Sequence, residues 1–194
     1  DKAVYARCIA QACTGREEHS MIGLEGKTLS SERLRYRLMQ SSDKVTLSEL
    51  LSDAEVTRTA GFLPAKTQKD FDDFFAALTM YNTCIAILLD EKLIGYIHVG
   101  KYKTELPELS GKFCVGLGFV IGKEYQNKGY GTETVKTVTD YLLSRFDCCF
   151  ADCFAENKAS AKVMEKCGYT YAEDYTMYFK ALREEHTCHS YFHM

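Results

Sequence analysis

The chain has 194 residues, of which 46% are hydrophobic and 26% charged, and its formal net charge is −3. This balance is typical of a globular domain with enough apolar side chain to build a core, and it excludes disorder throughout the chain. The charge, without any long basic run, gives no reason to expect nucleic-acid binding. No apolar run reaches the length of about 18 residues that a membrane-spanning helix needs.

Residues 1–14 are predicted to form a helix, because apolar side chains recur there at helical spacing. The polar, Gly-rich stretch 15–27 indicates a connector. We therefore expect an N-terminal helical extension with its connector over residues 1–27, followed by one domain over residues 28–194.

The first half of that domain alternates between strand and helix patterns. Strands are predicted where apolar side chains alternate, and helices where they recur every three or four residues. In chain order these are a strand at 34–39, a short helix near 47–51, a helix at 67–80, strands at 84–89 and 93–99, a polar excursion at 100–111 and a strand at 112–121.

The second half continues this alternation. The predicted elements are a helix at 132–146, a strand at 148–154, a helix at 158–167 that Asn157 caps and Gly168 ends, and strands at 169–182 and 187–193. Strands interleaved with single helices, with hairpins at both ends, predict an α/β domain in which helices cover a mixed sheet.

The chain contains nine cysteines, an odd number, and most of them lie inside apolar runs. No Cys-x-x-Cys pair occurs, and the regular spacing of a secreted disulfide framework is absent. We therefore expect buried, reduced thiols in a cytoplasmic protein.

The segment from Leu117 to Thr132 joins a strand to the strongest predicted helix through a short loop. The first backbone amides of a helix lack internal partners and lie at the positive end of its dipole. Gly129 and Gly131 would let an anion approach the main chain without obstruction by side chains. The pattern therefore predicts a phosphate-binding site made of main-chain amides.

Two common nucleotide-binding motifs do not fit this segment. A Walker loop needs a Lys before the Ser or Thr, but here Thr132 directly follows Gly131. A dinucleotide fingerprint needs a third glycine near the position that Thr134 occupies. We therefore expect a phosphate ligand of another class.

The Gln-x-x-Gly-x-Gly pattern at residues 126–131 resembles the pyrophosphate-binding motif of the GNAT superfamily of acyl-CoA-dependent N-acyltransferases. Residues 157–169 resemble the Asn-x-x-Ser helix, ending in Glu-Lys-x-Gly-Phe/Tyr, of its RimJ/RimL-like branch, which includes ribosomal-protein alanine and serine N-acetyltransferases. Residues 31–37, Ser-Glu-Arg-Leu-Arg-Tyr-Arg, resemble the start of the same branch. The resemblance spans about residues 28–193 and keeps the family's order.

This resemblance implies a mixed, mostly antiparallel central sheet of about seven strands flanked by helices. It also implies an enzyme that moves an acetyl group from acetyl-CoA to a primary amine by direct attack while both substrates are bound. The amine would be a protein N-terminal α-amine or a small-molecule amine. Acetyl-CoA is then a co-substrate, no metal is expected, and the protein would act as a monomer or a homodimer.

The resemblance also assigns acetyl-CoA to one strand, the loop after it and one helix cap. The strand would offer its main chain to the pantetheine arm, the loop and helix start would hold the pyrophosphate, and the cap would bond near the pantetheine. The implied binding residues are Phe119, Val120, Ile121, Gln126, Asn127, Lys128, Gly129, Tyr130, Gly131, Thr132 and Asn157.

Ser160 is placed by the resemblance near the departing sulfur, as a hydrogen-bond donor or part of a water relay. The branch often has a Glu where this chain has Gly116, so base catalysis from that position is absent. Candidate substitutes are His98, Asp152 or an ordered water relay. Without a strong base, an α-amine of pKa near 8 is easier to use than a lysine amine of pKa near 10.4, by roughly 3 kcal/mol.

Two other functions are compatible with these residues. A non-catalytic acyl-CoA-binding sensor would keep the fold without the chemistry, in line with Gly116. A Cys/His metal-binding module would use His186, Cys188, His189 and His193, although successive strand residues face opposite sides of a sheet.

Overall fold

The strand patterns pair into one mixed sheet. The computed structural model describes residues 22–194, and within that range the sheet has eight strands. They are β1 (Leu29–Ser30), β2 (Arg35–Leu38), β3 (Cys84–Leu89), β4 (Lys92–Tyr102), β5 (Cys114–Ile121), β6 (Cys148–Phe154), β7 (Thr170–Phe179) and β8 (Glu184–His193). Their order is β1-β2-β3-β4-β5-β6-β8-β7, and of the neighbouring pairs only β5 and β6 run parallel.

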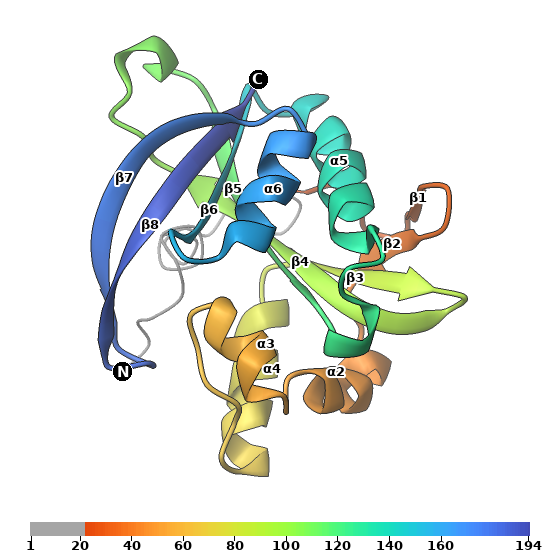
Figure 1. Ribbon diagram of the computed structural model, residues 1–194. Coiled ribbons are helices and arrows are strands. Elements are labelled where there is room, and N and C mark those ends of the chain that lie inside the picture. The colour runs from red at the N-terminus through yellow and green to blue at the C-terminus, as the bar shows by residue number, and fades with distance from the viewer. Residues whose placement is uncertain (1–21) are drawn as a thin grey trace.

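The helices cover both faces of this sheet. Figure 1 shows α5 and α6 side by side on one face, and α2, α3 and α4 together at the bottom of the view. Their bounds are α2 (Lys44–Leu50), α3 (Ala54–Thr59), α4 (Gln68–Thr79), α5 (Tyr130–Leu143) and α6 (Lys158–Lys166). In the part of the chain that the structure describes, no helix combines the length and the apolar character needed to cross a membrane.

Each face of the sheet buries its own apolar core, because strand side chains alternate between the two faces. Leu117 of β5 and Val138 of α5 belong to the core beneath α5 and α6. Tyr96 of β4 and Phe75 of α4 belong to the core beneath α2, α3 and α4. The two helical layers are therefore held to the sheet by separate sets of side chains.

The predicted α/β class, with a mixed and mostly antiparallel sheet flanked by helices, is confirmed. The sheet has one strand more than the expected seven. The short helix α3 was not predicted, because its six residues are too few to show a periodic stripe. Its N-cap identifies it instead, since the Asp53 side chain accepts the amide hydrogens of Glu55 and Val56.

Other boundaries differ from the predictions at the ends of strands. β4 extends to Tyr102, into the predicted polar excursion, and β8 begins at Glu184, before the predicted residue 187. The residues of both extensions pair with a neighbouring strand, so sheet pairing outweighs their weak local pattern.

The predicted helix at 1–14 lies outside the described residues. Ile22 and Leu24, which fall within the predicted connector, are buried in the core. The Tyr141 hydroxyl of α5 donates to the carbonyl of Ile22 at 2.9 Å. These contacts attach the described start of the chain to α5.

The seven described cysteines are buried and unpaired, as expected, while Cys8 and Cys13 lie outside the described residues. Burial raises the pKa of Cys149 to about 12 and that of Cys153 to about 11. These thiols therefore remain protonated at neutral pH and behave as small apolar side chains.

The feature of the sheet that matters most for function is the separation of β5 from β6. The two strands pair from Cys114 and Cys148 only as far as Leu117 and Ala151. Beyond that point β5 continues beside β4 and β6 continues beside β8. A gap therefore opens in the middle of the sheet.

A buried ion pair fixes the chain where β2 turns into α2. The guanidinium of Arg37 donates to both carboxylate oxygens of Asp43, at 2.6 and 2.8 Å, and the Gln40 amide donates to the same carboxylate at 2.8 Å. Asp43 is only 7% exposed, so solvent cannot replace these bonds.

We expect Asp43→Ala to lower the free energy of unfolding by about 3 kcal/mol, because it leaves the Arg37 charge partly buried without its partner. Glu91→Ala is the matched control, since Glu91 forms an exposed pair with Arg35 and should cost under about 1 kcal/mol. Urea denaturation measures both, and equal losses would contradict the assignment.

Candidate active site

A cavity of about 700 Å³ lies at the gap between β5 and β6, and residues on both faces of the sheet line it. On the α5 and α6 face its lining includes Gly129, Gly131, Thr132, Asn157, Ser160, Lys162 and Val163. On the other face it includes Glu55, Val56, Thr59, Tyr96, Asp152, Tyr175 and Phe179. A ligand bound through the gap can therefore meet a second ligand that enters from the opposite face.

The main chain of β5 faces this gap at alternate residues. The Gly122 amide donates to the Ile94 carbonyl of β4, and the Val120 carbonyl lies against Gly95 of β4. By the alternation of a strand, the amide and carbonyl groups of Phe119 and Ile121 point the other way, into the gap. Phe119 thus offers a donor and an acceptor to a ligand that lies along β5.

The predicted loop ends in the start of α5. Gly129 is the N-cap, with φ of +85°, and Asn127 also has a left-handed backbone, with φ of +59°. The intrahelical ladder begins with the Glu133 amide, which donates to the Gly129 carbonyl at 3.0 Å. The amides of residues 130–132 precede that first bond, so the positive end of α5 lies at the cavity wall.

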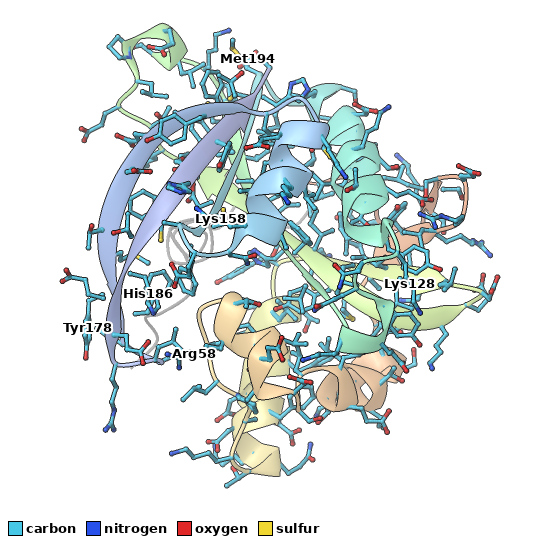
Figure 2. The ribbon with its side chains drawn as sticks, viewed as in Figure 1. Arg58, Lys128, Lys158, Tyr178, His186 and Met194 are labelled. Atoms are coloured by element: carbon cyan, nitrogen blue, oxygen red, sulfur yellow. The ribbon has the colours of Figure 1, made fainter. Side chains whose placement is uncertain are left out.

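Glycine at 131 accommodates the close approach of α5 to β5. A Cβ placed there would lie 3.3 Å from the Phe119 ring. Three lysines add positive charge near the start of the helices. Lys158 and Lys162 line the cavity, and Figure 2 shows Lys128 and Lys158 at the N-terminal ends of α5 and α6. The site therefore suits a ligand with several phosphate charges.

Arg33 reinforces this loop from a distant part of the chain, and the sequence patterns assigned it no role. Its guanidinium donates to the Lys128 carbonyl at 3.0 Å and stacks 4.5 Å from the centre of the Tyr130 ring. It also forms an ion pair with Glu133 at 2.7 Å. Since 95 residues separate Arg33 from Lys128, no local pattern could have revealed the contact.

The carboxylate of Glu133 collects several donors beside the start of α5. The Ser31 hydroxyl donates to it at 2.6 Å and the Arg33 amide at 2.8 Å. Burial alone would raise the pKa of Glu133, but these bonds and the Arg33 charge outweigh burial, and the pKa lies below its ordinary value. The residues just before β2 are thereby held against α5.

Asn157 and Ser160 lie together at the start of α6. The Asn157 side chain accepts the Ser160 amide at 3.1 Å, so Asn157 caps the helix as expected. Ser160 lies close enough to Cys153 to bond to its thiol. Both residues line the cavity on the α6 face, beside the gap.

Most of the residues predicted to bind acetyl-CoA meet at this cavity. Phe119, Val120, Ile121, Gln126, Asn127, Gly129, Gly131, Thr132 and Asn157 line it. The side chains of Lys128 and Tyr130 point elsewhere, since the Lys128 amine lies near the Tyr125 ring and Tyr130 lies under Arg33. Lys128 and Tyr130 would therefore take their expected part in binding through their main-chain groups.

His98 is not brought to the cavity. It is 4% exposed, and its Nε2 shares a hydrogen bond of 3.1 Å with the Thr83 hydroxyl. Burial lowers its pKa to about 4, so it is neutral at physiological pH. Asp152, by contrast, lines the cavity on the face opposite α6.

A chain of ion pairs lies near the cavity on that opposite face, beside Phe154 of its lining. Arg58 of α3 donates to Glu184 of β8, and His186 bonds to both Glu184 and Glu156. Figure 2 shows Arg58 and His186 close together at this edge of the molecule. His186 also stacks on the Phe154 ring, which lines the cavity, so α3, β6 and β8 are tied together there.

The residues on which a metal-binding module would depend do not converge. His186 contacts Glu156 and Glu184, His189 contacts Asp174, and Cys188 is buried on the face of the sheet opposite His189. Among residues 22–194, no three His, Cys, Asp or Glu side chains are grouped so that they could hold a metal ion.

Comparison with known proteins identifies the family to which this geometry corresponds. A family model described as an acetyltransferase (GNAT) domain matches residues 33–170. The chain is also 29% identical over 147 residues to the "Uncharacterized N-acetyltransferase YnaD" of Bacillus subtilis (strain 168), a match that covers 72% of this chain and 81% of that protein.

Solved structures share the fold. A GNAT-family acetyltransferase from Bacillus anthracis superposes with a TM-score of 0.73 at 23% identity, covering 86% of this chain and 98% of that one. RimL, an alpha-N-protein acetyltransferase in complex with coenzyme A, superposes with a TM-score of 0.71 at 14% identity, covering 87% of this chain and 98% of its own.

We expect Glu133→Gln to lower the free energy of unfolding by about 1 kcal/mol at pH 7, because the charge-assisted bonds from Ser31 and Arg33 are weakened. Since the folded pKa of Glu133 is depressed, its contribution is complete above the ordinary pKa of about 4.3 and is lost as the pH falls through the folded pKa. The difference from the parent should therefore shrink toward pH 3.

Urea denaturation at pH 7 and pH 3 measures this effect. Glu165→Gln, on the exposed side of α6, is the matched control and should leave the free energy of unfolding unchanged at both pH values. A Glu133→Gln deficit of the same size at both pH values would contradict an electrostatic role for this carboxylate.

Proposed function

The chain belongs to the GNAT acetyltransferase family, and from that premise we propose that it moves an acetyl group from acetyl-CoA to a primary amine, most readily a protein N-terminal α-amine, by direct attack in a ternary complex. The observation that carries this proposal is the cavity that crosses the sheet between β5 and β6. Its lining extends from the start of α5, where the pyrophosphate would bind, to side chains on the opposite face of the sheet.

The residues present fit acetyl-CoA, which when bound supplies an acetyl group activated as a thioester. The amides at the start of α5 would bind the pyrophosphate, with Gly129 and Gly131 allowing its close approach. The amide and carbonyl of Phe119 would pair with the pantetheine arm as a further strand does, beside the Asn157 side chain. Lys158 and Lys162 add charge complementarity.

The chemistry needs a donor where negative charge develops on the thioester oxygen. The amides of Phe119 and Ile121 point into the gap and are held in place by the sheet. They therefore need not reorient when the charge develops. Ser160, beside the gap on the α6 face, would donate to the departing thiolate. No thiol of the chain is required, in keeping with the raised pKa of Cys153.

An α-amine acceptor agrees with the site and with one relative. In the β5–β6 ladder Gly116 stands opposite Phe150, so this position supplies no carboxylate base. An α-amine loses its proton more easily than a lysine amine, and its use costs roughly 3 kcal/mol less at neutral pH. RimL, which shares the fold, is an alpha-N-protein acetyltransferase.

The proposal is tested by measuring CoA release from acetyl-CoA with a panel of amines. The panel contains peptides with free N-termini, the same peptides blocked at the N-terminus but carrying a lysine, spermidine and kanamycin. We expect release with the free N-terminal peptides and little with the blocked ones. Tight acetyl-CoA binding without release from any amine would instead indicate a non-catalytic sensor.

We expect Gly129→Asp to weaken CoA binding at least 100-fold, because it adds a negative charge at the N-cap of α5, which repels the pyrophosphate, and draws on Arg33, whose guanidinium would lie 3.3 Å from the added Cβ. The left-handed φ of +85° is one that Asp and Asn tolerate better than other side chains, so the fold should survive. Isothermal titration calorimetry with CoA measures the change.

Gly129→Asn is the matched control, since it has the same shape without the charge. We expect it to weaken CoA binding less than 10-fold on the same principle of charge repulsion. CoA affinity of Gly129→Asp equal to that of the parent would show that the loop does not hold the phosphates.

A further inference from the structure

Asp152 occupies a particular position on β6. Its neighbours Ala151 and Cys153 face the core beneath α5 and α6, so its own side chain faces the opposite side of the sheet. It directly follows Ala151, the last residue of β6 that pairs with β5. A carboxylate thus lies at the point where the gap begins, on the face away from the predicted phosphate site.

The space at Gly118, on the same face of the sheet as Asp152, is open. Gly118 follows Leu117, the last paired residue of β5, and is therefore the residue across the gap from Asp152. A Cβ built on Gly118 meets nothing within 4 Å. Gly118, Asp152 and Tyr96 all line the cavity, which leaves room for a small polar group between the two strands.

Tyr175 fixes the orientation of the Asp152 carboxylate. Tyr175 lies on β7, which β8 separates from β6, and its hydroxyl donates to Asp152 Oδ2 at 3.1 Å. Both side chains line the cavity, so the hydrogen bond forms part of its wall. A carboxylate held in one plane can present an oxygen to a ligand without losing further freedom.

The titratable groups around Asp152 leave its carboxylate as the proton acceptor best placed at the gap. Those on the same face include Tyr96 and His98 of β4, Glu173 and Tyr175 of β7, His186 and Cys188 of β8, and Glu55 of α3. Burial keeps His98 neutral, and burial together with the Asp152 charge raises the pKa of Cys188 to about 12. Glu55 is paired with Lys123.

We propose that Asp152 receives the primary amine and accepts the proton that its nitrogen loses, with Tyr175 as the positioning residue. This inference rests on the proposed function and names the acceptor side of the same site. It selects amines that are cationic before reaction and small enough at the nitrogen to enter between Gly118 and Asp152.

The ammonium nitrogen first loses one proton to the Asp152 carboxylate, which passes it to solvent, and this frees the nitrogen lone pair. The lone pair forms the new C–N bond to the thioester carbon, and the C–S bond breaks with its electron pair passing to sulfur. The second nitrogen proton ends on the thiolate, which leaves as CoA thiol.

The test compares Asp152→Asn with the parent, using acetyl-CoA and a peptide with a free N-terminal serine, and spermidine as a second amine. We expect kcat/KM to fall at least 100-fold, as for loss of a general base, while the Kd for CoA stays within 3-fold of the parent. Calorimetry on the CoA complex should show amine binding weakened about 10-fold by loss of the carboxylate charge.

The pH profile separates proton transfer from a structural role. The loss of kcat/KM in Asp152→Asn should become smaller as the pH rises toward the pKa of the amine, because more of the amine is then already neutral. Asp152→Glu, which keeps the carboxylate, should recover part of the activity. A deficit that is constant with pH, or no recovery in Asp152→Glu, would overturn the assignment.

Asp174→Asn is the matched control, since Asp174 lies on β7 with its side chain bonded to His189 on the other face of the sheet. It should change kcat/KM less than 3-fold, and a loss as large as that of Asp152→Asn would overturn the inference. If the parent releases no CoA with any amine of the panel, the proposed function fails. An active parent with an equally active Asp152→Asn variant overturns only the role of Asp152.

Discussion

The site depends on one departure from regular sheet pairing, the separation of β5 and β6 after Leu117 and Ala151. A continuous ladder would satisfy the main-chain groups of Phe119 and close the route between the two faces. Because each strand keeps its other neighbour, the gap stays open without loosening the sheet. A main-chain donor and acceptor are thus buried in the protein and available to a ligand.

The two sides of this gap differ in the charged groups that line them. On one side α5 and α6 direct their N-terminal ends, two lysines and the Asn157 cap toward the cavity, which suits an anionic ligand. On the other side the wall is aromatic and carries the Asp152 carboxylate, which suits a cation. The charged groups that line the cavity therefore differ in sign between its two sides.

The sequence predicts the side of the cavity at α5 and α6 better than the side that carries Asp152. The Gly129–Gly131 loop is a local pattern between a strand and a helix, so neighbouring residues suffice to identify it. Arg33 joins that loop across 95 residues, and α3 is too short for a periodic signal, so neither could be predicted. Periodicity also could not rank His98 against Asp152, because depth and the contact with Thr83 exclude His98 from the cavity.

The buried thiols can report local opening of the structure through the rates at which they are alkylated. A thiol reacts with an alkylating reagent only as an exposed thiolate, and burial denies both conditions to Cys149 and Cys188. Cys149 lies in the paired part of β6, whereas Cys188 lines the cavity on β8. The rates at which the reagent labels the two thiols therefore distinguish local opening of the β5–β6 ladder from opening of the cavity wall at β8.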